Sequence, residues 1–402
     1  MKLRITAGRA IGEVRVPPSK SMAHRLLICA GLADGISHIR NAGDCEDIRA
    51  TMDCLSILGA DCRQEPETVT VRGGILRAAP TEELPCRESG STLRFLIPLA
   101  LTADFPVSFT GYGRLPERPQ TVYEEICAGQ DLLFRRAGKT ICVCGPLRAG
   151  EFRIAGNISS QFVTGLLFAL PLLQRASRIV LIPPVESRPY IDLTLDVLRR
   201  FGILAGWESE TVLTVGGGQR YTPCDCEAEG DWSAGAFWKA LGQMGDNRIS
   251  IPNLDPASRQ GDRVCETYLA ALRAGPATLS LADCPDLGPI LFAYAAAAHG
   301  GTFTDVERLR IKESDRIGAM REELAKCGVE LTDHGNSVTV RGGMLRTPKV
   351  PFDGHGDHRI VMSLAVLATR TGGEILGAEA VRKSYPLFCE DLGKLGIRTE
   401  IQ

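Results

Sequence analysis

The nonapeptide VTVRGGILR at residues 69–77 recurs almost unchanged as VTVRGGMLR at residues 338–346. Eight of the nine letters agree, in a chain that contains no low-complexity tract. Alternating valine and threonine followed by paired glycines predicts a β-strand that ends in a turn. The same strand and turn in two distant places therefore indicate an internally duplicated fold.

Each copy ends a longer pattern, in which an apolar helix is followed by a glycine and then by two strands. Helix followed by glycine and strand is common in α/β proteins, so a single copy would mean little. Six copies at near-regular spacing favour duplication, because each copy alone would expose its apolar helix face. The predicted helix-ending glycines are Gly59, Gly129, Gly202, Gly275, Gly328 and Gly396.

Two of the six copies are incomplete. The copy that ends its helix at Gly275 has lost a strand, and the one that ends at Gly396 lacks its last strand. We expect the N-terminal strand KLRITAG, residues 2–8, to fill the second gap.

The length of 402 residues is typical of about two domains. A break near YTPCDCEAEGD (221–231) gives each domain three copies of the unit. We therefore predict one domain from residues 1–15 together with 226–402, and a second from residues 16–225. Pro17 and Pro18 mark the first crossing between the domains.

Composition excludes several classes of protein. A net charge of −2 gives no overall attraction for nucleic acid or anionic membranes. The first ten residues lack the apolar region of a signal peptide, and the apolar run at 162–173 is too short to span a bilayer. We therefore expect a cytoplasmic protein.

Fourteen cysteines in such a chain are expected to stay reduced. Two C-x-C pairs occur, Cys142 with Cys144 and Cys224 with Cys226, and neither has a histidine nearby in the sequence. The sequence therefore argues against a zinc or redox site at either pair.

Polar residues recur at the starts of apolar helices, where the helix dipole and free N–H groups attract anions. PPSKSMAHRLLICAG (17–31) and CRESGSTLRF (86–95) are two examples. Taken singly, each stretch is equally well explained as a serine N-cap with solvated charges. The candidate anion contacts in this half of the chain are Lys20, Ser21, Arg25, Gly90, Arg94, Arg114, Arg118, Ser159, Ser160, Gln161, Ser187, Arg188 and Tyr190.

The other half adds two carboxylates among cations. Asp286 precedes an apolar helix and is either a cap or a general base, and Glu313 lies in the charged stretch RLRIKESDR (308–316). Ordinary surface ion pairing is the alternative for that stretch. The further candidates are Lys312, Arg316, Asp357, His358, Arg359 and Lys383. Together the residues predict acid–base catalysis on small, strongly anionic substrates, without a metal or cofactor.

These residues resemble the 5-enolpyruvylshikimate-3-phosphate (EPSP) synthase family. The resemblance follows the whole chain in order, through PPSKSMAHR, SGSTLRF, GYGRLPERP, SSQF, SRPYIDLTLDVL, EGDWSAGAFW, PDLGP, IKESDR, GDHRIVMSLAV and RKSYP. It implies the two-domain α/β enolpyruvyl transferase fold, an inside-out α/β barrel with three βαβαββ repeats per domain and the active site in the interdomain cleft. It also implies transfer of the enolpyruvyl group of phosphoenolpyruvate to the 5-hydroxyl of shikimate 3-phosphate, by addition and elimination through a tetrahedral intermediate.

The resemblance also implies a role for each residue. The catalytic residues would be Asp286, Glu313 and Lys20. Asp286 would take the proton from the 5-hydroxyl, Glu313 would handle the proton at the vinyl carbon, and Lys20 would reach both substrates. Contacts with shikimate 3-phosphate would come from Lys20, Ser21, Arg25, Ser159, Ser160, Gln161, Ser187 and Tyr190, and Lys312 would touch a substrate hydroxyl. Contacts with phosphoenolpyruvate would come from Gly90, Arg114, Arg316, Arg359 and Lys383, and His358 is a further predicted substrate-binding residue. Glu88 and Arg308 stand where some members of the family have asparagine, so no role is carried over to them.

Two alternatives stay open at this stage. UDP-N-acetylglucosamine enolpyruvyl transferase shares the architecture, but its pattern has Lys-Asn near the start and usually a loop cysteine, where this chain has Lys20-Ser21 and no cysteine in 109–119. A non-catalytic binding protein built on the same repeats would not need Asp286 and Glu313. We expect a monomer whose partners are the two small substrates, with no nucleic acid, membrane, metal or cofactor.

Overall fold

The computed structural model describes all 402 residues. The chain divides into two compact units, with unit 1 formed by Met1–Pro17 and Gly230–Gln402 and unit 2 formed by Pro18–Glu229. The expected domain boundaries lay after residues 15 and 225, and the units change after residues 17 and 229. None of the helices has both the length and the apolar character that crossing a bilayer requires.

Unit 2 contains three four-stranded sheets. Their strand orders are β14-β3-β5-β4, β6-β7-β9-β8 and β10-β11-β13-β12. The strands are β3 (Ile36–Arg40), β4 (Asp61–Gln64), β5 (Thr68–Arg72), β6 (Leu84–Pro85), β7 (Val107–Thr110), β8 (Leu133–Ala137), β9 (Thr140–Cys144), β10 (Glu151–Ala155), β11 (Ser177–Ile182), β12 (Ala205–Trp207), β13 (Val212–Val215) and β14 (Cys226–Glu227). The helices are α1 (Lys20–Leu32), α2 (Glu46–Ile57), α3 (Gly90–Ala100), α4 (Thr121–Gln130), α5 (Ser160–Ala169) and α6 (Arg188–Arg200), with short 3₁₀ turns η1 (Leu115–Glu117) and η2 (Leu170–Leu172).

Unit 1 contains two four-stranded sheets, β20-β21-β1-β22 and β16-β17-β19-β18, and the pair β15-β2. The strands are β1 (Lys2–Ile5), β2 (Ile11–Glu13), β15 (Arg248–Ser250), β16 (Ala277–Ser280), β17 (Gly300–Thr304), β18 (Leu331–Asp333), β19 (Ser337–Arg341), β20 (Phe352–Asp353), β21 (Gly373–Leu376) and β22 (Thr399–Ile401). The helices are α7 (Trp232–Gln243), α8 (Cys265–Ala274), α9 (Gly288–Ala297), α10 (Arg316–Lys326), α11 (His358–Thr371) and α12 (Phe388–Lys394), with 3₁₀ turns η3 (Gly261–Val264), η4 (Pro285–Leu287), η5 (Glu307–Ile311) and η6 (Ala378–Lys383).

All five four-stranded sheets repeat one pattern, in which a parallel pair is followed by two antiparallel pairs. In β3 and β5, Ile36 pairs with Arg72, and in β17 and β19 Gly300 pairs with Arg341, so the two VTVRGG copies occupy equivalent strands. The N-terminal strand β1 lies between β21 and β22 and completes the sixth copy. This confirms the expectation that residues 2–8 fill that gap.

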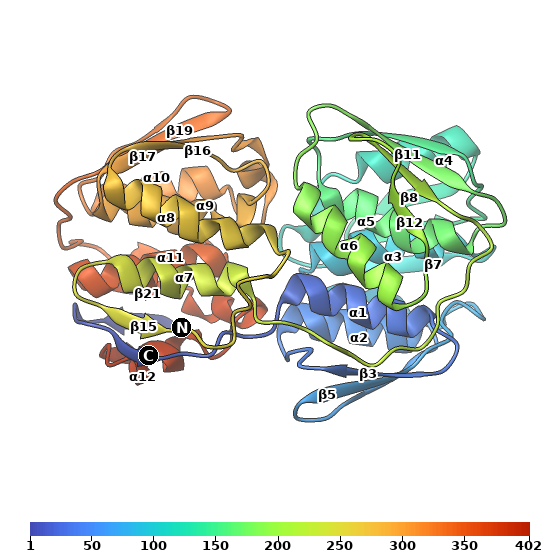
Figure 1. Cartoon of the computed structure of the whole chain (residues 1–402), viewed down its shortest axis with the longest axis horizontal. Helices are drawn as coiled ribbons and strands as arrows, with labels where there is room; N and C mark the ends of the chain where they lie inside the picture. The colour runs from blue at the N-terminus through green and yellow to red at the C-terminus, as the bar shows by residue number, and fades with distance from the viewer. The chain divides into compact units, whose positions relative to one another are not determined.

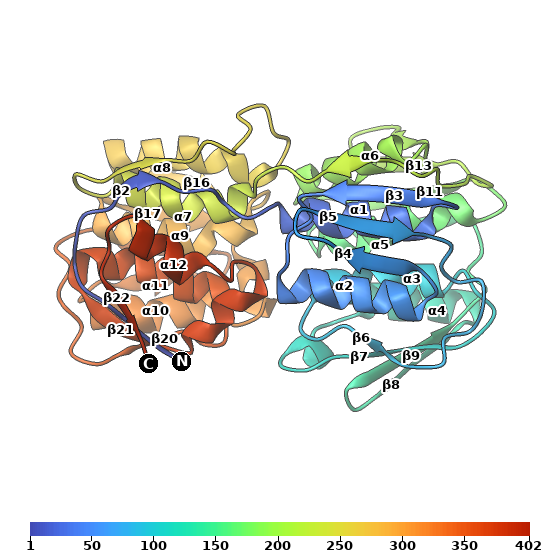
Figure 2. The same cartoon turned by 90° about the horizontal axis from the view of Figure 1, so that it is seen from below.

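The core of each unit is a set of buried helices, and the sheets cover them. Helices α1, α3 and α5 in unit 2, and α7, α9 and α11 in unit 1, are buried along almost their whole length. A helix buried on all sides is expected to be mostly apolar. The buried polar residues of α1 and α11, among them Arg25 and Arg359, are exceptions. In unit 2, for example, strands β3, β5 and β4 lie side by side and pack against helices α1 and α2 (Figure 2). Figure 1 shows β3 and β5 with the same two helices from another side. The strands form six separate sheets rather than one closed barrel.

The paired glycines of the two VTVRGG copies allow close packing. A Cβ on Gly73 would lie 2.2 Å from the carbonyl oxygen of Ala33, and one on Gly342 would lie 2.1 Å from the backbone nitrogen of Gly300. Only glycine permits such an approach of turn to backbone. The two preceding arginines, Arg72 and Arg341, are exposed, as the sequence predicts. The repeated motif therefore serves the scaffold.

One of the predicted helix-ending glycines does not end its helix. Gly129 lies inside α4, whose left-handed cap is Asp131 with φ 55°. Gly275 is the C-cap of α8, as predicted, and its backbone is extended where the chain passes into β16. The remaining four glycines have positive φ angles, as a helix-ending glycine requires.

Candidate active site

Arg316 is the centre of a charged cluster in unit 1. It is the first residue of α10, and its side chain is 1% exposed. Its Nε donates to Asp357 at 2.8 Å, and its two terminal nitrogens donate to Asp286 and Glu313, each at 2.8 Å. One buried guanidinium thus holds three carboxylates, and it brings together the two predicted catalytic carboxylates.

Asp286 is surrounded by positive charge. Besides Arg316, the ammonium of Lys312 lies 3.4 Å from its carboxylate, and a guanidinium nitrogen of Arg359 lies 3.2 Å away. Burial alone would raise the pKa of Asp286, but the charges of Arg359, Lys312 and Arg316 outweigh burial and hold the pKa well below its usual value. Asp286 is therefore ionised at neutral pH.

The local fold explains why these side chains meet. Asp286 lies in η4 directly before α9, and Asp357 caps α11 by accepting from the Arg359 backbone N–H at 2.9 Å. Asp357 also accepts from the Ser314 hydroxyl at 3.1 Å. Asp357 belongs to the motif that the sequence singled out, but its position beneath Arg316 was not predicted. Two further predicted residues, His358 at the start of α11 and Lys383 in η6, are buried in the same unit.

In unit 2, Arg25 on α1 connects that helix to α5 and α6. It is 2% exposed, and it donates to the hydroxyls of Thr194 at 2.8 Å and Thr164 at 3.3 Å. It also donates to the carbonyl oxygens of Ser21 at 2.6 Å and Tyr190 at 3.0 Å. Burial lowers the pKa of Arg25 to about 10, so the side chain stays charged at neutral pH.

Lys20 begins α1, whose N-cap Ser19 accepts from the Met22 backbone N–H. The Lys20 ammonium lies 2.8 Å from the Asp47 carboxylate on α2. Ser21 follows on the first turn and is partly exposed. The first turn of α1 therefore presents a cation and a hydroxyl, and the counter-ion Asp47 was not predicted from the sequence.

The loop between β7 and α4 places Arg118, rather than Arg114, against the turn at Gly90. A Cβ on Gly90 would lie 2.6 Å from the Arg118 guanidinium, whereas Arg114 is exposed. Gly113 in this loop has φ +59°, and a Cβ there would clash with the Glu88 carboxylate. Glu88 thus packs against the loop that carries Arg118. Both arginines stand in the same motif, and only packing distinguishes them.

The start of α5 carries uncharged donors. Ser159 is the N-cap and accepts from the Gln161 backbone N–H, and Ser160 is the first helical residue. The Gln161 side chain accepts from Arg94 at 2.8 Å and donates to Ser91 at 3.0 Å. This contact joins the starts of α3 and α5, which the sequence treated as separate stretches.

The start of α6 places two more predicted residues near Arg25. Ser187 is buried and takes the left-handed conformation with φ 57° as the N-cap. Tyr190, on the first turn, offers its backbone carbonyl to Arg25. Because Ser187 is not glycine, this backbone conformation is unusual and indicates a constrained turn.

One group of side chains has metal-ligand character, formed by Glu322, Glu323 and His355. The Glu323 carboxylate already accepts from the Lys326 ammonium at 2.7 and 2.9 Å, from His355 at 3.0 Å and from the Asp353 N–H at 2.9 Å. A metal ion would have to displace that ammonium group. The group is therefore an ion-pair network.

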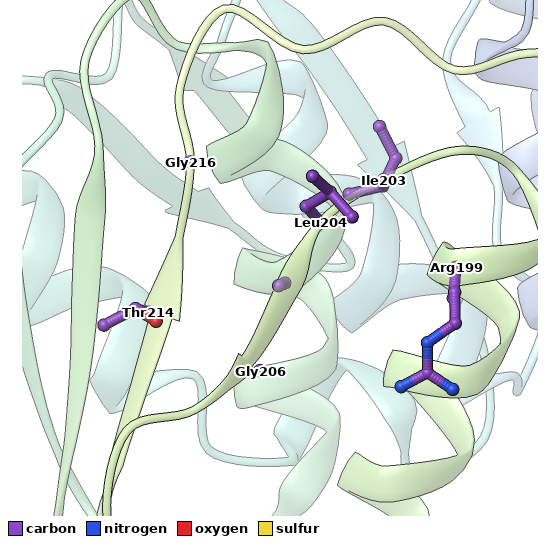
Figure 3. A pocket seen from close by; sticks show the side chains of 7 residues that line it. Arg199, Ile203, Leu204, Gly206, Thr214 and Gly216 are labelled. Atoms are coloured by element: carbon purple, nitrogen blue, oxygen red, sulfur yellow. The ribbon is translucent and has the colours of Figure 1, made fainter.

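Two cavities of about 280 Å³ each lie away from the predicted residues. The one in unit 2 lies between the end of α6 and strands β12 and β13 (Figure 3), where Arg199 points along its edge. The one in unit 1 is lined by β16, β17 and β19. Neither contains a residue predicted to act on substrate.

Comparison with known proteins gives a consistent result. The family described as EPSP synthase (3-phosphoshikimate 1-carboxyvinyltransferase) matches residues 6–392. A 3-phosphoshikimate 1-carboxyvinyltransferase from Clostridium kluyveri is 39% identical over 412 residues, which cover 96% of this chain and 95% of the relative. Another of that name from Clostridioides difficile is 36% identical and covers 99% of this chain and 98% of its own length.

Solved structures agree in fold. EPSP synthase from Acinetobacter baumannii matches with a TM-score of 0.80 at 22% identity, covering 100% of both chains. The enolpyruvyl transferase NikO from Streptomyces tendae matches with a TM-score of 0.79 at 16% identity, covering 99% of this chain and 98% of its own. At these identities the likeness supports the fold alone.

Proposed function

Because the chain belongs to the EPSP synthase family, it is an enzyme that transfers the enolpyruvyl group of phosphoenolpyruvate to the 5-hydroxyl of shikimate 3-phosphate, and we propose how its residues divide that reaction. The reaction proceeds by addition and elimination and releases phosphate. It needs a base for the attacking hydroxyl, an acid for the vinyl carbon and cations for two anionic substrates.

The observation that carries the assignment is the shared guanidinium of Arg316. It holds Asp286 and Glu313 at 2.8 Å each, so two carboxylates lie within one hydrogen-bonded group. We assign Asp286 as the base for the 5-hydroxyl and Glu313 as the group that protonates and deprotonates the vinyl carbon. The two carboxylates are bound by different nitrogen atoms of the buried Arg316 guanidinium. The two proton transfers would therefore take place at separate, fixed positions.

The depressed pKa of Asp286 has a mechanistic consequence. A carboxylate held ionised by three cations is a weak base, which suits substrate binding but not proton removal. Phosphoenolpyruvate brings a carboxylate and a phosphate, which draw hydrogen bonds from Arg359 and Lys312. The carboxylate of Asp286 then loses part of the positive charge that surrounds it. Its pKa rises, and it becomes a stronger base for the 5-hydroxyl.

This idea can be tested with pH profiles. The profile of kcat/KM reports the free enzyme, and that of kcat reports the bound complex. We expect the acidic limb of kcat to lie at higher pH than that of kcat/KM for phosphoenolpyruvate. If the acidic limbs of kcat and kcat/KM coincide, or if that of kcat lies at lower pH, substrate binding does not raise the pKa of Asp286 and the proposal is contradicted.

For shikimate 3-phosphate, the support comes from the uncharged donors of unit 2. Ser159 and Ser160 at the start of α5, and Ser187 at the start of α6, can bind phosphate through hydroxyls and helix N-termini. Gln161 and Tyr190 flank these starts. Lys20, Ser21 and Arg25 on α1 complete the proposed set, and Arg25 also fixes α1 to α5 and α6.

For phosphoenolpyruvate, we propose Gly90 together with Arg118 in place of Arg114. Arg118 is buried beside the Gly90 turn, whereas Arg114 is exposed to solvent. In unit 1 the proposed contacts are Arg316, His358, Arg359 and Lys383, with Lys312 near a substrate hydroxyl. The position of the active site between the two domains stays a prediction from the family resemblance.

The direct test is phosphate release by the purified protein. We expect release only when phosphoenolpyruvate and shikimate 3-phosphate are both present. Equal release with UDP-N-acetylglucosamine as acceptor would support the related transferase instead, and no release with either acceptor would support a binding protein. Retention of activity in EDTA is expected, and a loss that a divalent ion restores would contradict the absence of a metal step.

The proposal also includes a cytoplasmic location and a monomeric state. The location is supported by the fourteen cysteines, which are all free, because disulfides are rare in cytoplasmic proteins. Gel filtration of the active protein tests the second point, where a dimer at micromolar concentration would contradict it.

A further inference from the structure

The thiols of Cys224 and Cys226 lie in direct contact, with their sulfur atoms 3.1 Å apart. Side chains two residues apart on an extended strand share a face but are separated by roughly 6.6 Å along it. Here the two sulfurs converge across that gap. The sequence alone argued against a redox site at this pair, and the geometry reverses that interpretation.

Strand β3 holds the thiol pair in place. Cys226 pairs with Ile39 in the parallel ladder of β14 and β3. The Cys224 backbone N–H donates to the Ser37 hydroxyl at 3.1 Å, and the His38 N–H donates to Asp225 at 3.0 Å. Each of the three residues 224–226 is therefore attached to the same strand. The sulfur contact follows from a fixed backbone.

Two other cysteine pairs show what is unusual here. Cys54 and Cys86 also interact through their thiols, but both are 0% exposed and beyond the reach of a solute oxidant. Cys142 and Cys144 form a second C-x-C pair on β9 and are partly exposed, but their sulfur atoms do not contact each other. The thiols of Cys144 and Cys224 each contact the carbonyl of the following residue at 3.7 Å, so that contact does not distinguish the pairs. Only Cys224 with Cys226 combines sulfur contact with access.

We propose that Cys224 and Cys226 form a reversible intramolecular disulfide, with a low-molecular-weight disulfide of the glutathione class as the oxidant. The spacing permits it, because disulfides join Cα atoms about 4.4–6.8 Å apart and two residues of extended strand span about 6.6 Å. The bond would join two residues of one extended segment, and Cys226 lies three residues before the end of unit 2 at Glu229.

The chemistry proceeds in two balanced exchanges. The Cys224 thiol loses its proton and attacks the small disulfide, which forms a mixed disulfide and releases one small thiol. Cys226 then attacks the Cys224 sulfur, loses its own proton to solvent and releases the second small thiol. Two protein thiols are oxidised, and one small disulfide is reduced to two thiols.

The environment determines the order of attack. Burial and the contact with Cys224 raise the pKa of Cys226 to about 12, although Arg200 partly opposes the rise. Cys226 is also buried, whereas Cys224 is partly exposed. Cys224 is therefore the entry point, and Cys226 is the resolving thiol, with Arg200 placed to favour its anion.

The test uses the full-length protein in glutathione buffers of rising disulfide content, quenched with acid and alkylated. Trypsin separates the pairs, because residues 221–239 contain only Cys224 and Cys226 and residues 140–148 contain only Cys142 and Cys144. We expect the first peptide to lose two hydrogens and escape alkylation at a disulfide-to-thiol ratio at least about tenfold lower than the second. Dithiothreitol should restore it. Equal oxidation of both peptides would overturn the proposal.

Single substitutions test the order of steps. In Cys226→Ser the mixed disulfide cannot be resolved, so Cys224 should accumulate a glutathione adduct that the unsubstituted protein lacks. In Cys224→Ser the buried Cys226 should stay unmodified under the same conditions. Adducts on Cys226 in Cys224→Ser, or none on Cys224 in Cys226→Ser, would contradict the mechanism. All readouts are peptide masses, so the result does not depend on the transfer activity.

Discussion

Two buried arginines show how differently the two units are built. Arg316 in unit 1 is bonded to the carboxylates of Asp286, Glu313 and Asp357. Arg25 in unit 2 is bonded to two hydroxyls and two backbone carbonyls, with no carboxylate among its partners. The first is a charge-compensated network, and the second is a cation fixed by neutral dipoles.

The difference matches two kinds of chemistry. Carboxylates with compensating cations can exchange protons when a substrate alters the balance of charge. A cation and helix N-termini held by neutral groups keep their positive potential and bind an anion without proton transfer. We therefore expect substitutions of the unit 1 carboxylates Asp286 and Glu313 to act on turnover, and substitutions of the uncharged donors of unit 2 to act on affinity.

The largest effect is expected from Asp286→Asn. Removal of the base should lower kcat by about 10²–10⁴, the usual contribution of a general base. The change is measured by steady-state phosphate release. The matched control is Asp283→Asn, which removes an exposed carboxylate three residues earlier and should leave kcat within about twofold. A full-rate Asp286→Asn enzyme would remove this residue from the mechanism.

The next largest effect is expected on the free energy of unfolding, when Arg316 and Arg25 are each replaced by methionine. Arg316→Met leaves three carboxylates without their shared cation, so the free energy of unfolding should fall by about 3–5 kcal/mol. Arg25→Met should cost only about 1–3 kcal/mol, because Thr164 and Thr194 already bond each other at 2.9 Å. Urea unfolding measures both values. A larger loss for Arg25→Met would contradict the distinction between the units.

A smaller effect concerns the Gly90 turn. In Gly90→Ala the added methyl meets the Arg118 guanidinium, so that side chain must shift, at a cost of about 1–3 kcal/mol. We expect a higher KM for phosphoenolpyruvate with a smaller change in kcat. Gly129→Ala is the control, because no atom lies within 4 Å of the new methyl and the site is helical. An unchanged KM in Gly90→Ala would exclude Arg118 from this contact.

The smallest effect is the pH dependence of the pair His355 and Glu323. The bond to Glu323 raises the pKa of His355 above 6.5, so this stabilisation is present below pH 6.5 and is lost as pH rises through the raised value. Burial alone would raise the pKa of Glu323, but bonds from His355 and Lys326 lower it below 4.5, so its share is lost as pH falls through the lowered value.

The pair should therefore stabilise most between pH 4.5 and 6.5, by less than about 1 kcal/mol. His355→Gln should flatten the alkaline side of the stability profile, measured by urea unfolding at several pH values. An unchanged profile in His355→Gln would show that the bond contributes nothing.

The sequence predicted the fold well where patterns are local. The repeated unit, the buried helices and the polar starts of α1, α3, α5 and α11 follow from periodicity and capping, which depend on near neighbours. The N-terminal strand was also assigned correctly, because the last copy of the repeat lacked one strand. The prediction that a helix ends at Gly129 was wrong, because α4 continues to Gln130 and is capped by Asp131 in the left-handed conformation.

Contacts between distant segments were harder to predict. Arg114 and Arg118 stand in one loop without periodicity, and only the approach to Gly90 favours Arg118. Likewise, no sequence pattern joins Asp357 to Arg316 or brings the sulfurs of Cys224 and Cys226 together. Each depends on how separate elements pack, which residue spacing alone does not encode.

The most direct test measures kcat and the affinity for shikimate 3-phosphate in Ser187→Ala and Glu313→Gln. Ser187→Ala should weaken binding by about tenfold, the loss of one hydrogen bond to a charged group, with kcat within about threefold. Glu313→Gln should lower kcat by about 10²–10⁴ with nearly unchanged affinity. The reverse pattern, with turnover lost in Ser187→Ala and affinity lost in Glu313→Gln, would contradict the division of roles between the two units.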